Sequence, residues 1–238
     1  MGNESSVAQQ TEGIGKEFEL YTSRFNREET KAREITWKVL VADFLQQYIH
    51  AGDTVVDIGA GDGLFLCNVK AARRVAIDLS AHVGELEKFG VEILQVPATD
   101  LRQYFRGTAD VVFMSNFLEH LPDKRVLLRV LEECYAVLRP GGTIMILQPN
   151  IRYVGAAYWD YIDHHIALTE HSLTEALEVS GFKVTRLIPK FLPYTAKSVF
   201  GRLLTKVGGE AAIRYYLRFP LLWKIFGQQT FVVATRWR

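Results

Sequence analysis

The feature that most constrains the fold is an apolar run that ends in closely spaced glycines. Residues 54–58 read Thr-Val-Val-Asp-Ile, and Gly59, Gly61 and Gly63 follow directly. Such a run is typical of a buried strand, and glycines let the backbone turn sharply and approach a ligand with its N–H groups. Loops of this kind receive nucleotides at the carboxyl ends of parallel strands. We therefore expect an α/β domain with a nucleotide-like ligand at this loop.

The rest of the chain alternates strand-like and helix-like segments. Apolar runs bounded by Gly, Asp and Pro predict further strands near 73–78, 92–96, 109–116, 142–149, 183–189 and 229–235. Helical periodicity extends over 16–48, 63–71, 81–89, 123–138 and 172–180. This alternation is typical of a parallel sheet with helices on both faces. A chain of 238 residues, 48% hydrophobic and 23% charged, has room for one such domain with appendages.

The two ends of the chain differ in character from its centre. Residues 183–238 hold 11 Lys or Arg and one acid, which leaves 17 basic and 26 acidic residues before them. We predict an N-terminal helical cap over residues 1–50 and a ligand-binding core over 51–190. Residues 191–238 would form a basic, aromatic helical insert and the final strand of the same domain.

Details of the glycine segment distinguish between classes of nucleotide. An NAD-binding fingerprint spaces its glycines as GxGxxG, but here Leu64 takes the third position and the spacing from Asp57 is DxGxGxG. Twenty-one residues after Asp57 (78 − 57) the second strand ends in Asp78, whose carboxylate can accept hydrogen bonds from both ribose hydroxyls. The spacing favours S-adenosylmethionine over NAD. An NAD-dependent oxidoreductase and a non-catalytic cofactor-binding protein remain as alternatives.

Five segments occur in an order and spacing that resemble those of class I S-adenosylmethionine-dependent methyltransferases. They read VVDIGAGDG, AIDLS, PATDL, ADVVFMSNFLEHLPD and VLRPGGTIMILQPN, and the resemblance covers about residues 50–190. It implies a Rossmann-like three-layer sandwich whose seven-stranded sheet is mostly parallel, with an antiparallel last strand. It also implies S-adenosylmethionine as the co-substrate, lying across the carboxyl ends of the first four strands.

The resemblance also implies which residues contact the cofactor. Relatives carry an acid where Pro97 stands here, so the contact to the adenine amino group is expected at Asp100 or a backbone carbonyl. Ser115, at the end of the fourth strand, would lie beneath the methionine, with Phe117 facing the sulfonium. The full cofactor-binding set predicted from the sequence is Asp57, Gly59, Gly61, Gly63, Asp78, Leu79, Ala98, Thr99, Asp100 and Ser115.

Three histidines are candidates for removing a proton from a hydroxyl acceptor. His120 follows the fourth strand, and His164 and His165 follow the fifth, so all three border the expected ligand crevice. We expect no bound metal. In an alternative reading, Asp160 and Asp163 bind one with the paired histidines, although adjacent side chains in an extended segment point to opposite sides.

The acceptor is harder to predict than the cofactor. Tyr153, Tyr158, Trp159 and Tyr161 suit stacking on a sugar or an aromatic ring, or else packing at the domain edge. The stretch 151–195 resembles methyltransferases associated with bacterial polysaccharide and glycolipid assembly. We therefore expect O-methylation of a sugar or glycolipid intermediate, with a small aromatic, quinone or lipid acceptor as the alternative.

The basic insert suggests where the protein acts. Arg214 and Arg218 lie one helical turn apart, and Trp223 and Phe226 are residues that favour a membrane interface, although a solvated lid is an equal alternative. Pro220 should divide the segment into two short helices. No apolar run approaches the roughly 20 residues needed to cross a bilayer. We expect a cytoplasmic protein with peripheral contact to the inner face of the membrane, and a nucleic-acid partner is only a minor alternative.

Overall fold

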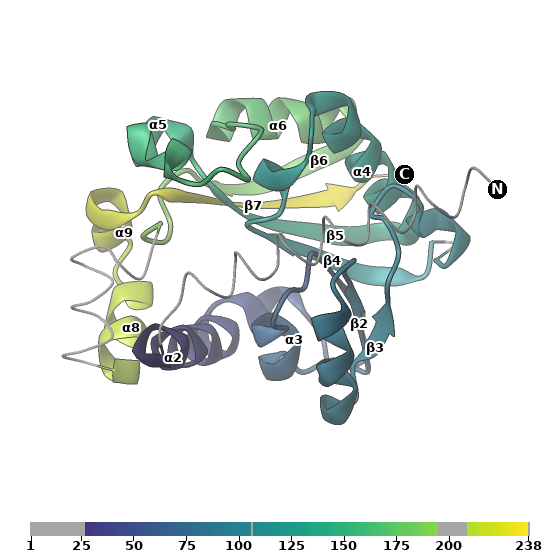
Figure 1. Ribbon diagram of the computed structural model, residues 1–238, viewed down its shortest axis with the longest axis horizontal. Coiled ribbons are helices and arrows are strands. Elements are labelled where there is room, and N and C mark those ends of the chain that lie inside the picture. Colours follow the sequence, from purple (N-terminus) through teal and green to yellow (C-terminus); the bar gives the residue numbers. More distant parts are fainter. Residues whose placement is uncertain (1–26, 106, 195–208, 238) are drawn as a thin grey trace.

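The computed structural model describes residues 27–105, 107–194 and 209–237 (Figure 1). Its centre is a seven-stranded sheet in the order β3-β2-β1-β4-β5-β7-β6. β1 to β5 run parallel, and β7 pairs antiparallel with both β5 and β6. This confirms the predicted Rossmann-like, mostly parallel sheet with an antiparallel last strand. The strands are β1 (Thr54–Ile58), β2 (Arg73–Ile77), β3 (Glu92–Leu94), β4 (Ala109–Ser115), β5 (Leu138–Pro149), β6 (Phe182–Ile188) and β7 (Gln229–Arg236).

Helices cover both faces of the sheet, because successive side chains of each buried strand point to opposite sides. Val55 and Val111 pack into one core, and Val56 and Val112 into the other. The first core is covered by α2 (Arg27–Asp43), η1 (Leu45–Tyr48), α3 (Leu64–Asn68), η2 (Ala81–Phe89), α8 (Gly209–Arg218) and α9 (Pro220–Phe226). The second is covered by η3 (Leu101–Gln103), η4 (Leu118–His120), α4 (Lys124–Val137) and α6 (Glu170–Val179).

Helix starts follow from local capping. Asp123 accepts hydrogen bonds from the backbone N–H groups of Arg125 and Val126, so α4 begins where the sequence predicts. Thr169 and Ser172 form a reciprocal capping box at the start of α6. α4 ends at Val137, one residue before the predicted end at 138. The start of β5 differs from the predicted 142, because β5 already begins at Leu138, which pairs with Ala109 before a register shift in the ladder.

The C-terminal insert is anchored in the core rather than exposed throughout. As predicted, Pro220 separates two short helices, α8 and α9. Trp223, expected at a membrane interface, is instead buried, with its ring centroid 5.1 Å from that of Phe191, and it donates a hydrogen bond to the Tyr216 backbone oxygen. The membrane prediction was wrong for this residue, because its ring fills the core beneath α9.

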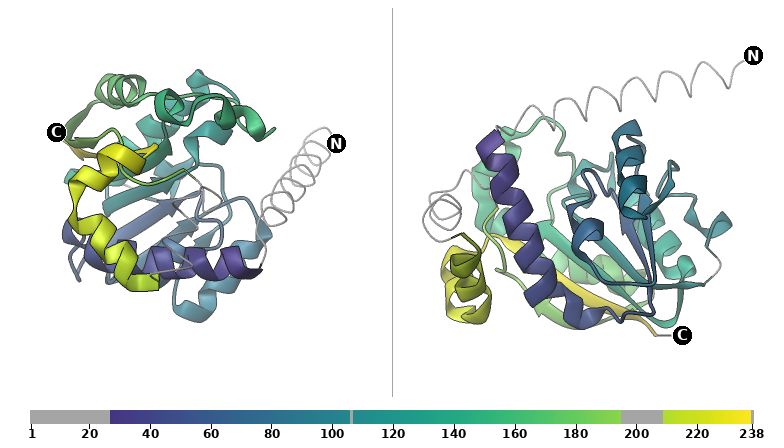
Figure 2. Two further views of the ribbon diagram at one scale, coloured as in Figure 1. Left: turned by 90° about the vertical axis from the view of Figure 1, so that its left-hand side faces the viewer. Right: turned by 90° about the horizontal axis from the view of Figure 1, so that it is seen from below.

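The N-terminal helix lies beside the insert. Figure 2 shows α8, in yellow-green, against α2, in purple, with α9 continuing away from α2. Arg214 of α8 donates hydrogen bonds to both carboxylate oxygens of Asp43, and Lys38 of α2 pairs with Glu210 at 2.6 Å. Arg214 is therefore engaged with α2, in contrast to Arg218, which is exposed. None of the helices within the described ranges is long and apolar enough to cross a membrane.

Candidate active site

The loop after β1 has glycine at three positions for two different reasons. Gly59, Gly61 and Gly63 all have positive φ, at +70°, +54° and +67°, a region that side chains disfavour. A Cβ at Gly59 would lie 2.4 Å from the Phe117 ring, and one at Gly63 would lie 2.3 Å from Leu86. A Cβ at Gly61 would meet no protein atom within 4 Å. Gly59 and Gly63 therefore serve packing, whereas Gly61 faces open space that a ligand can occupy.

Asp78, at the end of β2, ties this loop to the neighbouring strand. Its Oδ2 accepts a hydrogen bond from the Gly61 backbone N–H at 2.8 Å, and its Oδ1 accepts one from the Ser80 N–H at 2.8 Å. The Gly61 N–H is thus used inside the protein and is not directed at a ligand, contrary to the sequence expectation. Each carboxylate oxygen has a second lone pair, so the half-buried Asp78 can still accept from a ribose hydroxyl.

Three carboxylates surround the glycine loop. The Asp57 side chain is buried in β1, and burial, followed by the neighbouring Asp78 and Asp62 carboxylates, raises its pKa well above the ordinary value of 3.8. Asp62 forms an ion pair with Arg33 of α2 at 2.9 Å. The acidic side chains disfavour an anionic ligand such as a pyrophosphate, and a cationic group beside Asp57 would favour the charged form that burial disfavours. The electrostatics of the loop therefore suit a ligand that carries ammonium and sulfonium groups.

The residues expected around an adenine lie at the ends of β2 and β3. Leu79 exposes 41% of its surface next to Asp78, which makes it an apolar face available for stacking. Ala98 and Thr99 are half-buried in a turn that is closed by a hydrogen bond from the Asp100 N–H to the Pro97 oxygen. The Asp100 side chain is exposed. The structure thus brings these four residues to the sheet edge that carries Asp78.

The end of β4 has two features typical of a ligand site. The Ser115 hydroxyl oxygen is buried and has no hydrogen-bond partner among the described residues. Asn116 is the non-glycine residue with positive φ in the described part of the chain, at 49°, and such strained conformations cluster at functional sites. Phe117 follows and packs its ring on Gly59. The chain beyond β4 therefore passes directly alongside the glycine loop.

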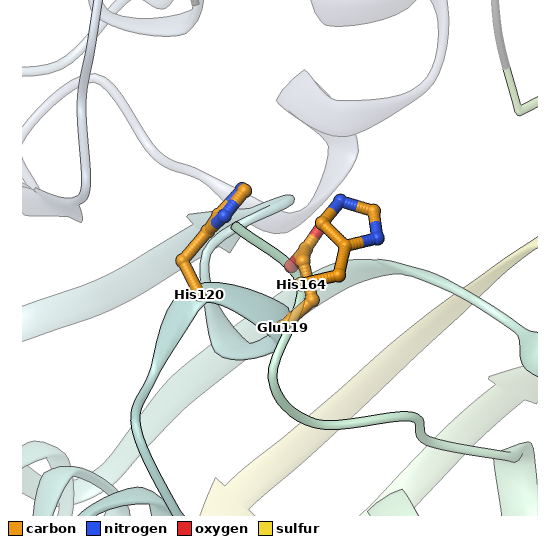
Figure 3. Close-up of side chains that lie close together, drawn as sticks. All are labelled: Glu119, His120 and His164. Atoms are coloured by element: carbon orange, nitrogen blue, oxygen red, sulfur yellow. The ribbon is translucent and has the colours of Figure 1, made fainter. Parts of the chain in front are cut away.

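Glu119, His120 and His164 form a compact cluster next to this turn (Figure 3). One potential ligand atom from each residue lies within 4.8 Å of the others, and the two imidazole centroids are 5.2 Å apart. Gln148 of β5 donates a hydrogen bond to Glu119 Oε2 at 2.9 Å. Burial raises the pKa of Glu119, partly offset by the nearby His120. Two of the three predicted catalytic histidines are thus brought together.

The third histidine does not share this environment. His165 is exposed, whereas His164 is buried, as expected for adjacent residues in an extended segment. Only the backbone N–H of His165 reaches the cluster, where it donates to the Glu119 backbone oxygen at 2.8 Å. Asp160, named in the alternative metal-binding set, is also exposed, and the carboxylate of Asp163 lies 3.3 Å from His120 Nδ1.

The aromatic residues of the acceptor region divide into two groups. Tyr158 is fully buried in η5 (Gly155–Asp160), its hydroxyl donates a hydrogen bond to the Ile166 backbone oxygen, and burial raises its pKa. It is therefore a packing residue and not a stacking surface for substrate. Trp159 exposes 54% of its surface, and Tyr153 and Tyr161 are partly exposed. These three remain available to an acceptor.

Sequence reasoning missed Glu119, Gln148 and a pocket at the carboxyl edge of the sheet. The pocket lies between α5 (Ile151–Val154), Lys190, and the end of α9 with the residues that follow it. Its lining residues are Arg152, Tyr153, Lys190, Ile225, Phe226, Gly227 and Gln228. Arg152 pairs with Glu170 at 3.2 Å, and the Lys190 ammonium lies 5.2 Å from the centroid of the Tyr153 ring. The sequence did contain one indication of Glu119: it directly precedes the candidate His120, and a charged residue in that position can belong to the same site.

A comparison with known proteins agrees with this geometry. Residues 30–187, more than half of the chain, match the family model of a methyltransferase domain. Among curated proteins, a ubiquinone biosynthesis O-methyltransferase of Pseudomonas savastanoi pv. phaseolicola is 31% identical over 109 residues, which are 42% of this chain and 46% of the relative. The match therefore spans about half the length of such relatives.

Solved structures resemble the fold over most of the chain. An S-adenosylmethionine-dependent methyltransferase of Thermotoga maritima, described as a possible histamine N-methyltransferase, superposes with a TM-score of 0.66 at 17% identity and covers 94% of this chain and 99% of its own. A second such enzyme, of Archaeoglobus fulgidus, gives a TM-score of 0.59 at 21% identity, with 83% and 92% covered. At these identities the likeness shows the fold alone.

Proposed function

The chain belongs to the methyltransferase domain family, and on that premise we propose that it uses S-adenosylmethionine to methylate a hydroxyl group of a small molecule. The observation that carries the proposal is the open face of Gly61 beside the Asp78 carboxylate, within a ring of three acidic side chains. An NAD-dependent oxidoreductase fits less well, because an anionic pyrophosphate at this loop would lie next to those carboxylates.

The residues present fit S-adenosylmethionine. Asp78 would accept from its ribose hydroxyls, Leu79 would cover the adenine, and Asp57 with the buried Ser115 hydroxyl would lie beneath its methionine end. When bound, it supplies an electrophilic methyl group: the acceptor oxygen bonds to the methyl carbon, the electron pair of the breaking carbon–sulfur bond goes to sulfur, and the hydroxyl proton leaves. The chain's part is to hold the acceptor oxygen in line, at roughly 3–3.5 Å.

Activation of the acceptor hydroxyl, which must lose its proton, is assigned to the cluster of Glu119, His120 and His164. Its first residue, Glu119, lies two residues after Phe117, which packs on the glycine loop, and this supports a place for the cluster beside the methyl group of a bound cofactor. His165 has no part in this assignment, because its side chain is exposed on the other side of the segment.

For the acceptor we propose a sugar or glycolipid intermediate. Arg152 and Lys190 line the pocket at the sheet edge, and Ile225 and Phe226 give the same pocket an apolar side. That combination suits an amphiphile with an anionic group, such as a lipid-linked glycan phosphate. A phenol or quinone is the second candidate, supported by the likeness to ubiquinone biosynthesis O-methyltransferases.

The experiment that tests the function uses purified protein and S-adenosylmethionine labelled in the methyl group. Two acceptor pools are supplied in parallel: a lipid-linked glycan fraction of cell envelopes, and a phenol and quinone fraction. We expect S-adenosylhomocysteine to form with the glycan fraction and the label to enter one product as an O-methyl group. Label in the quinone fraction alone would favour the second candidate. Tight cofactor binding without turnover on either pool would leave a non-catalytic cofactor-binding protein.

We also propose that the protein acts in the cytoplasm with peripheral contact to the inner face of the membrane. Exposed apolar residues line α8 and α9 next to the cationic Arg218 and Lys224. These apolar residues are Tyr215, Phe219, Leu221, Ile225 and Phe226. An apolar ridge flanked by basic side chains suits an anionic lipid surface.

Vesicle co-sedimentation tests this contact. We expect binding to vesicles that contain phosphatidylglycerol, little binding to pure phosphatidylcholine, and a decrease as salt screens the charges. Leu221→Glu should weaken the binding, because Leu221 is 68% exposed and would insert a charge into the interface. Absence of binding, or binding that does not respond to salt, would leave the insert as a lid.

A further inference from the structure

We propose that Glu119, His120 and His164 bind one divalent transition-metal cation, which in turn binds the acceptor hydroxyl. This deepens the proposed function and rests on it only for the role of the cation in the reaction. The sequence predicts no metal, and its alternative ligand set was Asp160, Asp163, His164 and His165. The structure points to a different set, of which only His164 was named.

The hydrogen bonds of each imidazole indicate its tautomer, that is, which ring nitrogen carries the proton. His120 Nδ1 lies 3.0 Å from the backbone oxygen of Asp163, and His164 Nδ1 lies 2.8 Å from that of Tyr158. A carbonyl oxygen can only accept, so each Nδ1 must carry a proton. In a neutral imidazole this leaves the lone pair on Nε2, the atom that coordinates. Metal-binding histidines characteristically donate their other N–H to a backbone carbonyl or a carboxylate.

The carboxylate is held in a similar way. Glu119 is buried, and Gln148 Nε2 donates to its Oε2, which orients the carboxylate from β5. Gln148 is 1% exposed, and its Oε1 has no hydrogen-bond partner among the described residues. The hydrogen bonds to Glu119 come from neutral donors, the Gln148 amide and a backbone N–H, and a cation would supply the charge that a buried carboxylate needs.

The geometry and the ligand types indicate which cation fits. In a four-coordinate zinc site, bonds of about 2.1 Å place the ligand atoms roughly 3.4 Å apart. One candidate ligand atom from each residue lies within 4.8 Å of the others, and side-chain rotations would bring a Glu119 oxygen and both Nε2 atoms to a common cation. Two imidazoles and one carboxylate suit Zn²⁺, Co²⁺ or Mn²⁺ and leave a coordination position open. At that position a cation lowers the pKa of a hydroxyl, whose proton is then released to water.

Direct titration with Co²⁺ tests the site without reference to methyl transfer. The protein is stripped with a chelator, and Co²⁺ binding is followed by calorimetry and by the visible absorption of the coordinated ion. We expect one equivalent to bind to the wild type and the affinity to fall at least tenfold in Glu119→Gln and in His120→Ala. Glu119→Gln keeps the side-chain shape and an oxygen for Gln148, and His120 is half-exposed, so both variants should fold.

His171→Ala is the matched control, because His171 is 77% exposed and lies outside the cluster. It should bind Co²⁺ like the wild type, and all variants should retain S-adenosylmethionine binding. Absence of saturable Co²⁺ binding in the wild type, or equal binding by His120→Ala, would overturn the site. Binding without methyl transfer to any acceptor would support the site while the proposed function fails. Undiminished transfer by the chelator-treated protein would overturn the cation's role and leave the function intact.

Discussion

Replacing Asp78 by alanine is expected to weaken S-adenosylmethionine binding by about 1–3 kcal/mol, or roughly 5- to 150-fold in Kd. Two effects add to this loss. The ribose hydroxyls lose a charged acceptor, and the Gly61 N–H loses the partner that holds the loop in its left-handed conformation. Isothermal calorimetry with the co-substrate and with S-adenosylhomocysteine measures the change.

Glu92→Ala is the matched control for this variant. Glu92 is also a carboxylate next to β2, but it lies at the start of β3, at the opposite end of these strands from Asp78, where it is exposed and bonds to Arg73. Its removal should leave cofactor affinity within error of the wild type. Because Asp78→Ala also frees the Ser80 N–H, unfolding by urea is measured in parallel, and the titrations are made where each variant is fully folded. Unchanged affinity in Asp78→Ala would mean that the ribose lies elsewhere.

The strands were predictable because parallel strands are buried on both faces. Residues such as Val55, Val56, Val111 and Val112 all lie in one of the two cores, so each strand reads as a continuous apolar run between Gly, Asp and Pro. The antiparallel β7 followed only from the resemblance, and the order of the strands was not predicted. The early start of β5 at Leu138 was missed, because a strand through Pro140 depends on pairing with β4 that local sequence does not encode.

The site was predictable where one short segment builds it. Its predicted residues lie directly after a strand, where the local sequence is informative: Gly59, Gly61 and Gly63 follow β1, and Asp78 follows β2. The cluster around Glu119 was not predictable in full, because it joins η4, the segment after η5, and Gln148 of β5. Likewise, Trp223 has the side chain of a membrane-interface residue, and only the packing of Phe44 and Phe191 around it reveals a core position.

The glycine loop itself permits a second test, in which Gly61→Ala and Gly63→Ala have opposite consequences. Both add a methyl group at a positive φ, which costs roughly 1–2 kcal/mol for an alanine. At Gly63 the methyl would also lie 2.3 Å from the buried Leu86, and overpacking of this kind adds about 1–3 kcal/mol of destabilisation. At Gly61 it meets no protein atom within 4 Å, so little further loss of stability is expected.

Ligand affinity should show the reverse order. We expect Gly61→Ala to bind S-adenosylmethionine at least tenfold more weakly, since its methyl occupies the space in which the ligand lies against the loop, while its stability to urea falls only by the roughly 1–2 kcal/mol that the positive φ costs. Gly63→Ala should unfold at lower urea, and adding Leu86→Ala should cost less than the sum of the two single changes, because the clash is gone. If Gly61→Ala bound the ligand like the wild type, the cofactor would not pass over this residue. If the losses of unfolding free energy in Gly63→Ala and Leu86→Ala added fully in the double variant, the loop would have relaxed away from η2. Glycine would then be required at position 63 only for its backbone conformation.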